Sequence, residues 1–278
     1  MTPARTAGGS SRALGAPRAL KAALKRAIPE RWAIHLQAAD HYLRGEPEIR
    51  LLRGLCDRRK AAVDIGANIG TYAYFLRRYA AEVIAYEPNP ALATRLRRIF
   101  PNVVVRAVGL HDHADTLTLR VPVRGGLSLH ELGSVSQHFD DDTQIEQYEV
   151  EVTSLDAETC ARHPIGFIKV DVEQVEIPVL HGAVNTIARD RPNIMSEVAP
   201  LLYPAPLPEM FRFILDLDYQ GYVTYRGRIM SFAGFRPDLH ARKEGFPHDF
   251  INNNVFFLPR EVTPRKVFGR RYESDTLG

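Results

Sequence analysis

Cysteine is scarce in this sequence, and long apolar runs are missing. The two cysteines, Cys56 and Cys160, have neither the spacing of metal ligands nor that of a disulfide framework. No apolar run approaches the roughly 20 residues that a membrane-spanning helix needs. Residues 1–18 are mainly Ala, Gly, Ser, Pro and Arg, lack the apolar segment of a secretory signal, and are expected to be disordered. These features predict a cytoplasmic protein.

Positive charge is concentrated near the N-terminus. Residues 1–60 carry a net charge of +8, whereas the rest of the chain carries −5. Residues 19–43 show helical spacing of apolar residues, and Pro29 is expected to divide them into two helices. This segment is either a helical cap packed on the domain or a basic amphipathic surface that contacts anionic lipid or an acidic glycan. The second role would place the protein peripherally at the inner membrane surface.

The stretch AAVDIGANIG at residues 61–70 predicts a buried strand, a tight turn and the start of a helix. Gly66 and Gly70 would permit the turn and a close approach by a ligand. A second apolar strand ends in Glu87, about twenty residues after the turn. A carboxylate at that place can accept hydrogen bonds from both hydroxyls of a ribose. The stretch therefore indicates a nucleotide site.

The spacing of the turn discriminates between nucleotides. A dinucleotide turn has three glycines and places a pyrophosphate at a helix N-terminus, but here two glycines occur and Asp64 precedes them. A carboxylate would repel a pyrophosphate and would suit the ammonium of an amino acid moiety. The D-x-G-x-x-x-G turn resembles that of S-adenosylmethionine (SAM) dependent methyltransferases, and Glu87-Pro-Asn-Pro90 resembles their ribose-binding strand end. A NAD-type nucleotide and a turn without any ligand are the alternatives.

Apolar strands alternate with helical segments along the chain. A helix at 91–100 and a third strand at 102–108 complete three β-α repeats, which predict a doubly wound, mostly parallel α/β sheet. Ligands of such sheets bind outside the carboxyl ends of the strands. Further strands are expected at 192–197, 219–225 and 254–258, the last two as a closing antiparallel pair.

The segment after the third strand interrupts this rhythm. Alternating stretches at 116–121 and 148–153 predict strands, and residues 125–143 between them are rich in Gly, Ser, His and Asp. A loop of that length in a compact domain is usually functional or mobile, so we expect a lid over the active site. Its histidines, His130 and His138, are expected to be solvated rather than catalytic.

Three carboxylates follow the predicted strand at 167–170. Asp171, Glu173 and Glu176 would concentrate negative charge at the carboxyl edge of the sheet. One can act as a general base, or several can hold a divalent cation through oxygen ligands. The helix dipole also favours acids at a helix N-terminus, and this explanation is preferred for Glu176. Asp171 is the first candidate for the base, followed by Glu173 and His181.

Five stretches, found in order over about residues 60–200, together resemble the FkbM family of SAM-dependent methyltransferases. They are VDIGANIGTY, YEPNP, TSLD, IKVDVEQVE and VLHGA. The resemblance implies a Rossmann-like class I methyltransferase fold and O-methylation of hydroxyls on sugars or polyketides. It implies catalytic roles for Asp171 and Glu173 near the transferred methyl. The implied cofactor contacts are Asp64, Gly66, Ala67, Asn68, Gly70, Glu87 and Asn89.

One position departs from the family pattern, and three alternative functions are weighed against this assignment. The family usually reads D-x-E-G-x-E, whereas Gln174 replaces the glycine here, which would alter the turn that aims Glu173. A nucleic-acid methyltransferase acting on exocyclic amines would carry an Asn/Asp-Pro-Pro-aromatic loop after the fourth strand, so nucleic acid is not an expected partner. A NAD-linked oxidoreductase would need a third glycine in the turn, which this sequence does not have. A non-catalytic binding protein would not need the acidic cluster.

Four segments are expected in the chain. They are a disordered basic tail at 1–18, a helical extension at 19–58, a methyltransferase domain at 59–262 and a loosely ordered C-terminal tail at 263–278. The expected cofactor is SAM, and the acids leave room for Mg²⁺ or another divalent cation. The expected partner is a small molecule or a glycan.

Overall fold

An eight-stranded sheet with the order β11-β10-β12-β9-β8-β1-β2-β3 forms the centre of the protein. The structure is a computed structural model and describes residues 30–44, 47–124, 127–130, 133–135, 143–158, 161–172, 174–198, 207–225, 227–234 and 254–273. The strands of this sheet are β1 (Ala61–Ile65), β2 (Glu82–Tyr86), β3 (Val104–Arg106), β8 (Ile165–Val170), β9 (Asn193–Glu197), β10 (Tyr219–Tyr225), β11 (Arg228–Ser231) and β12 (Asn254–Pro259).

Parallel pairing dominates this sheet. The neighbours β3, β2, β1, β8 and β9 run parallel, whereas β12 pairs antiparallel with both β9 and β10, and β10 pairs antiparallel with β11. The predicted doubly wound α/β sheet with a closing antiparallel pair is therefore confirmed, and β11 is an additional edge strand. The strand order reverses between β1 and β8, which makes their carboxyl ends the expected place for a ligand.

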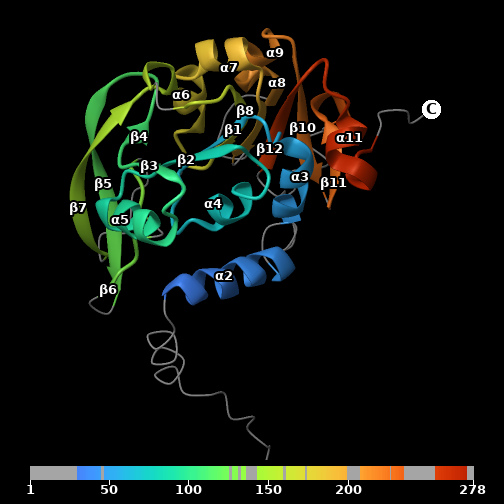
Figure 1. Cartoon of the computed structure of the whole chain (residues 1–278). Helices are drawn as coiled ribbons and strands as arrows, with labels where there is room; N and C mark the ends of the chain where they lie inside the picture. Colours follow the sequence, from blue (N-terminus) through green and yellow to red (C-terminus); the bar gives the residue numbers. More distant parts are fainter. Residues whose placement is uncertain are drawn as a thin grey trace, which may run out of the picture.

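Helices cover both faces of the sheet (Figure 1). One apolar cluster joins a face of the sheet to α2 (Glu30–Arg44), α3 (Leu52–Leu55), α4 (Thr71–Leu76), α5 (Pro90–Ile99) and α11 (Pro264–Phe268). A second cluster joins the other face to α6 (Glu176–His181), α7 (Val184–Asp190), α8 (Leu207–Met210) and α9 (Arg212–Leu215). Short 3₁₀ turns are η1 (Pro47–Leu51), η3 (Leu155–Ala157), η5 (Phe232–Gly234) and η6 (Gly269–Arg271).

The alternation of side chains along β1 explains why both faces are apolar. Ala62 belongs to the cluster under α4, whereas Ala61, Val63 and Ile65 belong to the cluster under α6 and α7. Successive side chains of a strand point to opposite faces, so a strand buried on both sides reads as a continuous apolar run. Asp64 interrupts that run on the α4 face, and its surroundings are described with the site below.

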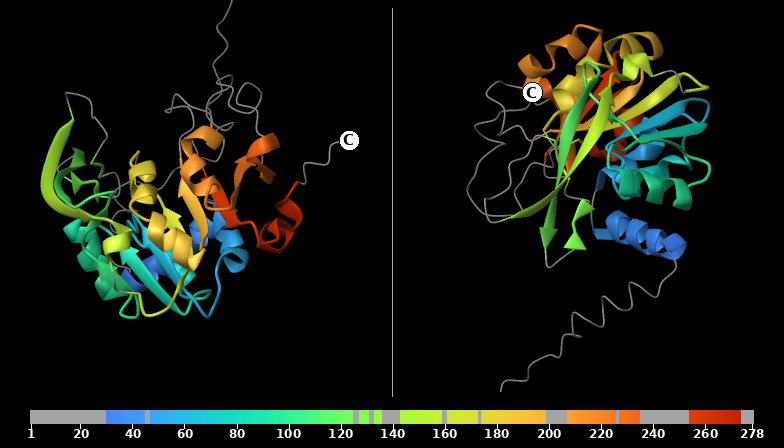
Figure 2. Two further views of the ribbon diagram at one scale, coloured as in Figure 1. Left: turned by 90° about the horizontal axis from the view of Figure 1, so that it is seen from above. Right: turned by 90° about the vertical axis from the view of Figure 1, so that its left-hand side faces the viewer.

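A second sheet stands beside the β3 edge of the first (Figure 1). It has the order β4-β7-β5-β6 and consists of β4 (Gly109–Leu110), β5 (Asp115–Arg124), β6 (Leu127–Ser128) and β7 (Gln144–Thr153). Figure 2 shows, from above, that its long strands curve alongside the main sheet. The two strands expected between the third and fourth β-α units are confirmed, and both are longer than their alternating patterns indicated.

Helix α2 packs one face on α4 and presents the other to solvent. Ile34 and Ala38 are buried against the body of the protein. Trp32, Leu36 and Leu43 are 59%, 60% and 70% exposed. The predicted helix C-terminal to Pro29 is thus confirmed, and residues 1–29 lie outside the described part of the chain. None of the helices among the described residues has the length and apolar character that crossing a membrane requires.

The C-terminal segment is more ordered than expected. Residues 264–268 form α11, and η6 follows it. Val267 and Phe268 are buried, and the Phe268 ring packs edge-on against Tyr222 and Phe256, with 5.4 Å between ring centroids in each pair. Proline at the first helical position, preceded by Thr263, is a typical helix start. The expectation of a loose tail is therefore wrong for these residues, because two apolar side chains attach the helix to the sheet.

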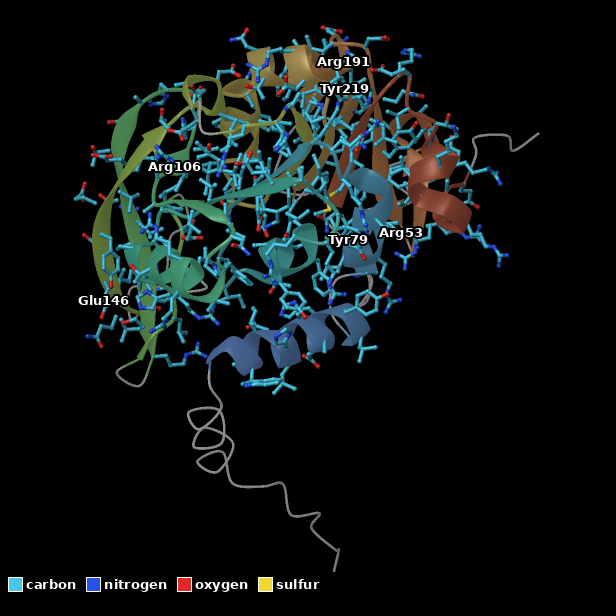
Figure 3. All side chains as sticks on the ribbon, in the orientation of Figure 1. Arg53, Tyr79, Arg106, Glu146, Arg191 and Tyr219 are labelled. Carbon is cyan, nitrogen blue, oxygen red and sulfur yellow. The ribbon has the colours of Figure 1, made fainter. Side chains whose placement is uncertain are left out.

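Arg191 follows α7 and links this helix to the residues just before β10 and just after β12; Figure 3 shows it beside Tyr219. Its guanidinium donates two hydrogen bonds of 2.7 Å to the Glu261 carboxylate and a third, of 2.9 Å, to the Leu217 carbonyl. It also lies 5.2 Å from the centroid of the Tyr219 ring. The hydrogen bonds from Arg191 lower the pKa of Glu261 to about 2. This junction holds the ends of β9, β10 and β12 in register.

Candidate active site

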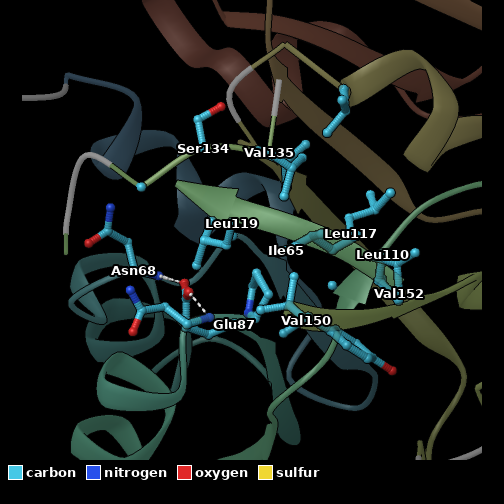
Figure 4. Close-up of a pocket in the computed structure, with 18 of the residues that line it drawn as sticks. Ile65, Asn68, Glu87, Leu110, Leu117, Leu119, Ser134, Val135, Val150 and Val152 are labelled. Atoms are coloured by element: carbon cyan, nitrogen blue, oxygen red, sulfur yellow. Dashed lines mark hydrogen bonds between the residues drawn. The ribbon is translucent and has the colours of Figure 1, made fainter. Parts of the chain in front are cut away.

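A pocket opens where the carboxyl ends of β1, β2 and β8 meet the second sheet (Figure 4). It encloses about 850 Å³ of empty space, including the part open to solvent. Polar groups from the main sheet line one side. Apolar side chains from the second sheet line the other, namely Leu110, Leu117, Leu119, Val150 and Val152. A largely apolar cleft with a few placed polar groups is typical of a site for a small ligand.

Five of the nine residues predicted for the site line this pocket. They are Gly66, Asn68, Glu87, Asn89 and Asp171. Asp64, Ala67 and Gly70 are buried next to it without lining it. Glu173 lies outside the described residues. The structure thus brings the predicted ribose-binding acid and the predicted base to one cavity.

Glu87 is held rigidly at the side of the pocket. Its Oε2 accepts a hydrogen bond of 2.7 Å from the backbone N–H of Asn68, and its Oε1 accepts one of 2.9 Å from that of Asn89 (Figure 4). Asn68 has a left-handed backbone with φ of 52°, a conformation that asparagine tolerates better than most residues. Burial raises the pKa of Glu87 to about 7, although the two backbone donors oppose the shift.

The Glu87 carboxylate has acceptor capacity beyond its two backbone hydrogen bonds. A carboxylate offers about four acceptor positions on its two oxygens, and the backbone donors described above occupy one on each oxygen. One further position per oxygen is the capacity that two adjacent ribose hydroxyls require. Because Glu87 is anchored by the turn after β1, it can meet that ribose without reorganising.

Lys169 is a site residue that the sequence reasoning missed. It is 4% exposed and lies opposite the fully buried Asp64 in the β1–β8 register. Its ammonium is 3.6 Å from Asp64 Oδ1, 3.0 Å from Asp171 Oδ2 and 4.7 Å from the Tyr72 ring centroid. It also donates a hydrogen bond of 3.3 Å to the Gly66 carbonyl. A lysine inside an apolar strand was the available signal, because buried charges are almost always paired.

Asp64 therefore has a protein cation beside it. Burial raises the pKa of its carboxyl, and the nearby Lys169 ammonium opposes that shift. Asp64 faces the side of the sheet covered by α4 and does not line the pocket. The sequence predicted that this carboxylate would bind the ammonium group of the cofactor. In the structure, the cation beside it is Lys169.

The two glycines of the turn make room for protein atoms. A Cβ at Gly66 would lie 1.8 Å from the Asp171 carbonyl oxygen, so this glycine lets the ends of β1 and β8 come together. A Cβ at Gly70 would lie 2.5 Å from the Phe100 ring, where α4 meets α5. Both glycines have positive φ, of 74° and 90°. The close approach expected from a ligand is thus made by the protein itself, although Gly66 also lines the pocket.

The loop after β8 presents Asp171 and buries Glu176. The Asp171 side chain is partly exposed and lines the pocket. Glu176 Oε1 accepts hydrogen bonds from the backbone N–H groups of Gln174, at 3.0 Å, and Val172, at 3.4 Å. Burial raises the pKa of Glu176, and these donors oppose the shift. Glu176 lies in the first turn of α6, as expected, and its carboxylate closes the loop before that helix.

Two histidines lie differently from what the sequence indicated. His130 is half-buried and lines the pocket, and its Nδ1 is 3.1 Å from Nδ2 of Asn89. His130 is therefore less exposed than expected, because the chain just after β6 returns over the pocket. His138 lies outside the described residues. His181 stacks on Phe213, with ring centroids 3.8 Å apart, and does not line the pocket, so it is no longer a candidate base.

Comparison with known proteins gives a family. The model described as "Methyltransferase FkbM domain" matches residues 64–224, more than half of the chain. No curated protein matched the sequence. The strand order, the pocket at the switch point and the family match agree with the Rossmann-like class I methyltransferase fold.

Solved structures with similar folds include three methyltransferases. The FkbM methyltransferase of Methylobacillus flagellatus KT has 15% identity and a TM-score of 0.45, over 85% of this chain and 57% of that one. A TehB-like SAM-dependent methyltransferase of Corynebacterium glutamicum has 12% identity and a TM-score of 0.41, over 86% of this chain and 99% of that one. A methyltransferase of Streptococcus mutans in complex with SAH has 11% identity and a TM-score of 0.38, over 76% of this chain and 94% of that one. The assignment rests on the family model, and by that match the chain belongs to the FkbM methyltransferase family.

Proposed function

We propose that this protein transfers a methyl group from SAM to a hydroxyl of a sugar, a glycan or a polyketide-like natural product. The observation that carries the proposal is that Glu87 and Asp171 line one pocket at the switch point of the sheet. The first suits a ribose and the second suits an acceptor hydroxyl. A non-catalytic nucleotide binder would gain nothing from a carboxylate at the second place, and a NAD-linked enzyme would need a phosphate-binding turn.

The protein has two tasks in this reaction. SAM supplies a methyl group that is already activated on a sulfonium, so the protein must align an acceptor oxygen and remove its proton. In our proposal Asn68, Glu87 and Asn89 orient the nucleoside end of the pocket. Asp171 accepts the proton, and the Lys169 ammonium at 3.0 Å fixes the direction of that carboxylate. Glu173 is the second acid that we assign to the acceptor side.

The metal-assisted version of this mechanism is less well supported. In that version Asp171 and Glu173 would hold Mg²⁺, which would acidify the acceptor hydroxyl. The Lys169 ammonium already compensates the charge of Asp171, and a cation bound at the same oxygen would be repelled by it. We therefore assign proton removal to the carboxylate alone. Chelator treatment that leaves turnover unchanged would agree with this assignment.

The decisive experiment compares turnover with cofactor affinity in matched variants. Asp171→Asn keeps the shape of the side chain and removes the base, so we expect turnover to fall about 10²–10⁴-fold with SAM affinity unchanged. Glu173→Gln is the parallel test for the second acid. Release of S-adenosylhomocysteine is measured over a panel of glycans and small alcohols, and calorimetry compares SAM with NAD. Preferential binding of NAD, or full turnover in Asp171→Asn, would contradict the proposal.

We also propose that this protein contacts an anionic membrane peripherally, from the cytoplasmic side. Trp32, Leu36 and Leu43 are exposed on α2, with the spacing of one helical face. Residues 1–29 contain six Lys or Arg and no Asp or Glu. Apolar side chains that enter the boundary of headgroups and acyl chains, next to cations that attract anionic lipid, are the two elements of an interfacial helix.

A further inference from the structure

Three consecutive residues after β4 bring their side chains together at the edge of the pocket. His111, Asp112 and His113 each offer one ligand atom, and these atoms all lie within 4.8 Å of one another. His111 lines the pocket, whereas Asp112 and His113 are exposed. The proposed methyl transfer uses none of the three. This cluster therefore calls for an explanation of its own.

The spacing of the two imidazoles is that of ligands to a common ion. Nδ1 of His111 and Nδ1 of His113 are 3.3 Å apart. Two ligands at about 2.0–2.1 Å from a tetrahedral ion are separated by about 3.3 Å. Asp112 Oδ1 lies 2.6 Å from the first of these nitrogens and contacts the second. Both contacts of Asp112 are hydrogen bonds and are shorter than the roughly 3.3 Å between two ligands of one ion. Metal binding would therefore replace these hydrogen bonds, and the Asp112 carboxylate would turn to face the ion.

The backbone that carries this cluster is fixed on two sides. The N–H of His111 donates a hydrogen bond of 2.7 Å to the Thr153 carbonyl at the end of β7. On the other side, a Cβ at Gly182 would lie 2.0 Å from the His111 carbonyl oxygen, so a glycine admits the loop. Nε2 of His113 faces Asp115 Oδ2 at 3.8 Å, and ligand histidines commonly have a carboxylate on their second nitrogen. The loop is therefore preorganised.

We propose that His111, Asp112 and His113 bind a divalent transition-metal ion of the zinc class at the mouth of the pocket. Two imidazoles and one carboxylate suit Zn²⁺, Co²⁺ or Ni²⁺, whereas Mg²⁺ prefers a set of oxygen ligands. Three protein ligands leave a fourth coordination position for water. This site is separate from the acids after β8, and the proposal of a metal there does not depend on whether the acceptor is a sugar.

The test is binding of the metal itself to the full-length, chelator-treated protein. Zn²⁺ is titrated by calorimetry, and Co²⁺ by its visible absorption, which reports coordination directly. We expect saturable binding that is at least tenfold weaker in His113→Ala and in Asp112→Asn, since even an outer-shell partner is typically worth about 10–100-fold. His163→Ala is the matched control, because His163 is another exposed histidine in a different loop, and its affinity should equal that of the wild type.

Two results would overturn the proposal. One is the absence of saturable Zn²⁺ or Co²⁺ binding. The other is equal binding by the wild type, His113→Ala and Asp112→Asn, which would show that the ion attaches elsewhere. Thermal unfolding of each variant without metal serves as the folding check, and no change is expected, because both side chains are largely exposed.

Discussion

Glu87 combines a rigid position with a pKa near neutrality. Its pKa is raised from an ordinary value of 4.5 to about 7 by burial. Above pH 7 the ionised carboxylate can accept hydrogen bonds from both ribose hydroxyls. As the pH falls below 7 the group binds a proton and loses acceptor capacity. We expect SAM affinity to weaken by up to about tenfold per pH unit on that side.

Calorimetry with SAM between pH 6 and 8.5 measures this dependence. Above pH 7, Glu87→Gln should bind SAM more weakly than the wild type by about 1.5–3 kcal/mol, and its affinity should show no step near pH 7. A wild-type affinity that is constant over this range would contradict the ribose assignment. The contribution of Glu87 to the stability of the fold depends on pH in the opposite direction. Because the folded pKa is raised, the contribution of Glu87 to stability is full below about pH 4.5 and is lost as the pH rises through 7.

Lys169 and Asp64 should behave as a coupled pair in unfolding experiments. Both are buried, with 3.6 Å between ammonium and carboxylate. Lys169→Met would leave a buried carboxylate uncompensated, which typically costs about 3–5 kcal/mol. In the double variant Asp64→Asn, Lys169→Met that charge is gone, so we expect a smaller loss than the sum of the single variants. Urea unfolding measures all three. Additive losses would mean that the two groups do not stabilise each other.

Gln174 occupies a backbone conformation that favours glycine. Its φ is 79°, at the position where the family pattern has glycine. A left-handed residue with a Cβ costs about 1–2 kcal/mol, and the extra freedom of glycine in the unfolded chain offsets about 0.5–1 kcal/mol of that. We expect Gln174→Gly to stabilise the protein by up to about 1 kcal/mol in urea unfolding. Gln174→Ala keeps the Cβ and should give no gain. A loss of stability in Gln174→Gly would indicate that the Gln side chain contributes contacts.

Helix α2 is the element on which membrane binding should depend. Its exposed face can be removed without touching the packed face, because Ile34 and Ala38 point to the body of the protein. We expect Trp32→Ser, Leu36→Ser to weaken sedimentation with anionic vesicles at least tenfold and to leave the unfolding midpoint unchanged. Deleting residues 1–29 should reduce binding further and remove its salt dependence.

Neutral vesicles provide the control, and the full-length protein should not sediment with them. If the full-length protein ignores anionic vesicles at low salt, α2 is a structural cap with an exposed apolar face. If it forms a concentration-dependent dimer through the same residues, the partner is a second copy rather than a lipid surface.

Elements with a simple period were predictable, and elements fixed by distant contacts were less so. The strands β1, β2 and β8 are mostly apolar, and each was recognised from that pattern. Helix α11 was missed because its two apolar residues are too few to give a period, although Pro264 marked its start. His130 was assigned to solvent because β6, which returns it to the pocket, contains only two residues. Its position depends on pairing with β5 rather than on local sequence.

At the scale of the whole molecule, two sheets share one pocket. The main sheet supplies the polar residues at its carboxyl edge, and their places were predictable because parallel strands end together there. The second sheet supplies an apolar wall, and nothing in its alternating sequence identified which face would meet the first sheet. Lys169 is a similar case, since its pairing with Asp64 and Asp171 depends on the register of β1 against β8.

The chain segment that forms the second sheet begins and ends at neighbouring positions. Gly109 and Leu110 of β4, where the insertion begins, pair in parallel with Val152 and Thr153 of β7, where it ends. An insertion with neighbouring ends can be exchanged as a module without displacing the strands that flank it. Replacing the β5–β7 hairpin by that of a relative, in evolution or in the laboratory, should therefore change the range of acceptors. The residues of the main sheet that we assign to the nucleotide would stay unchanged.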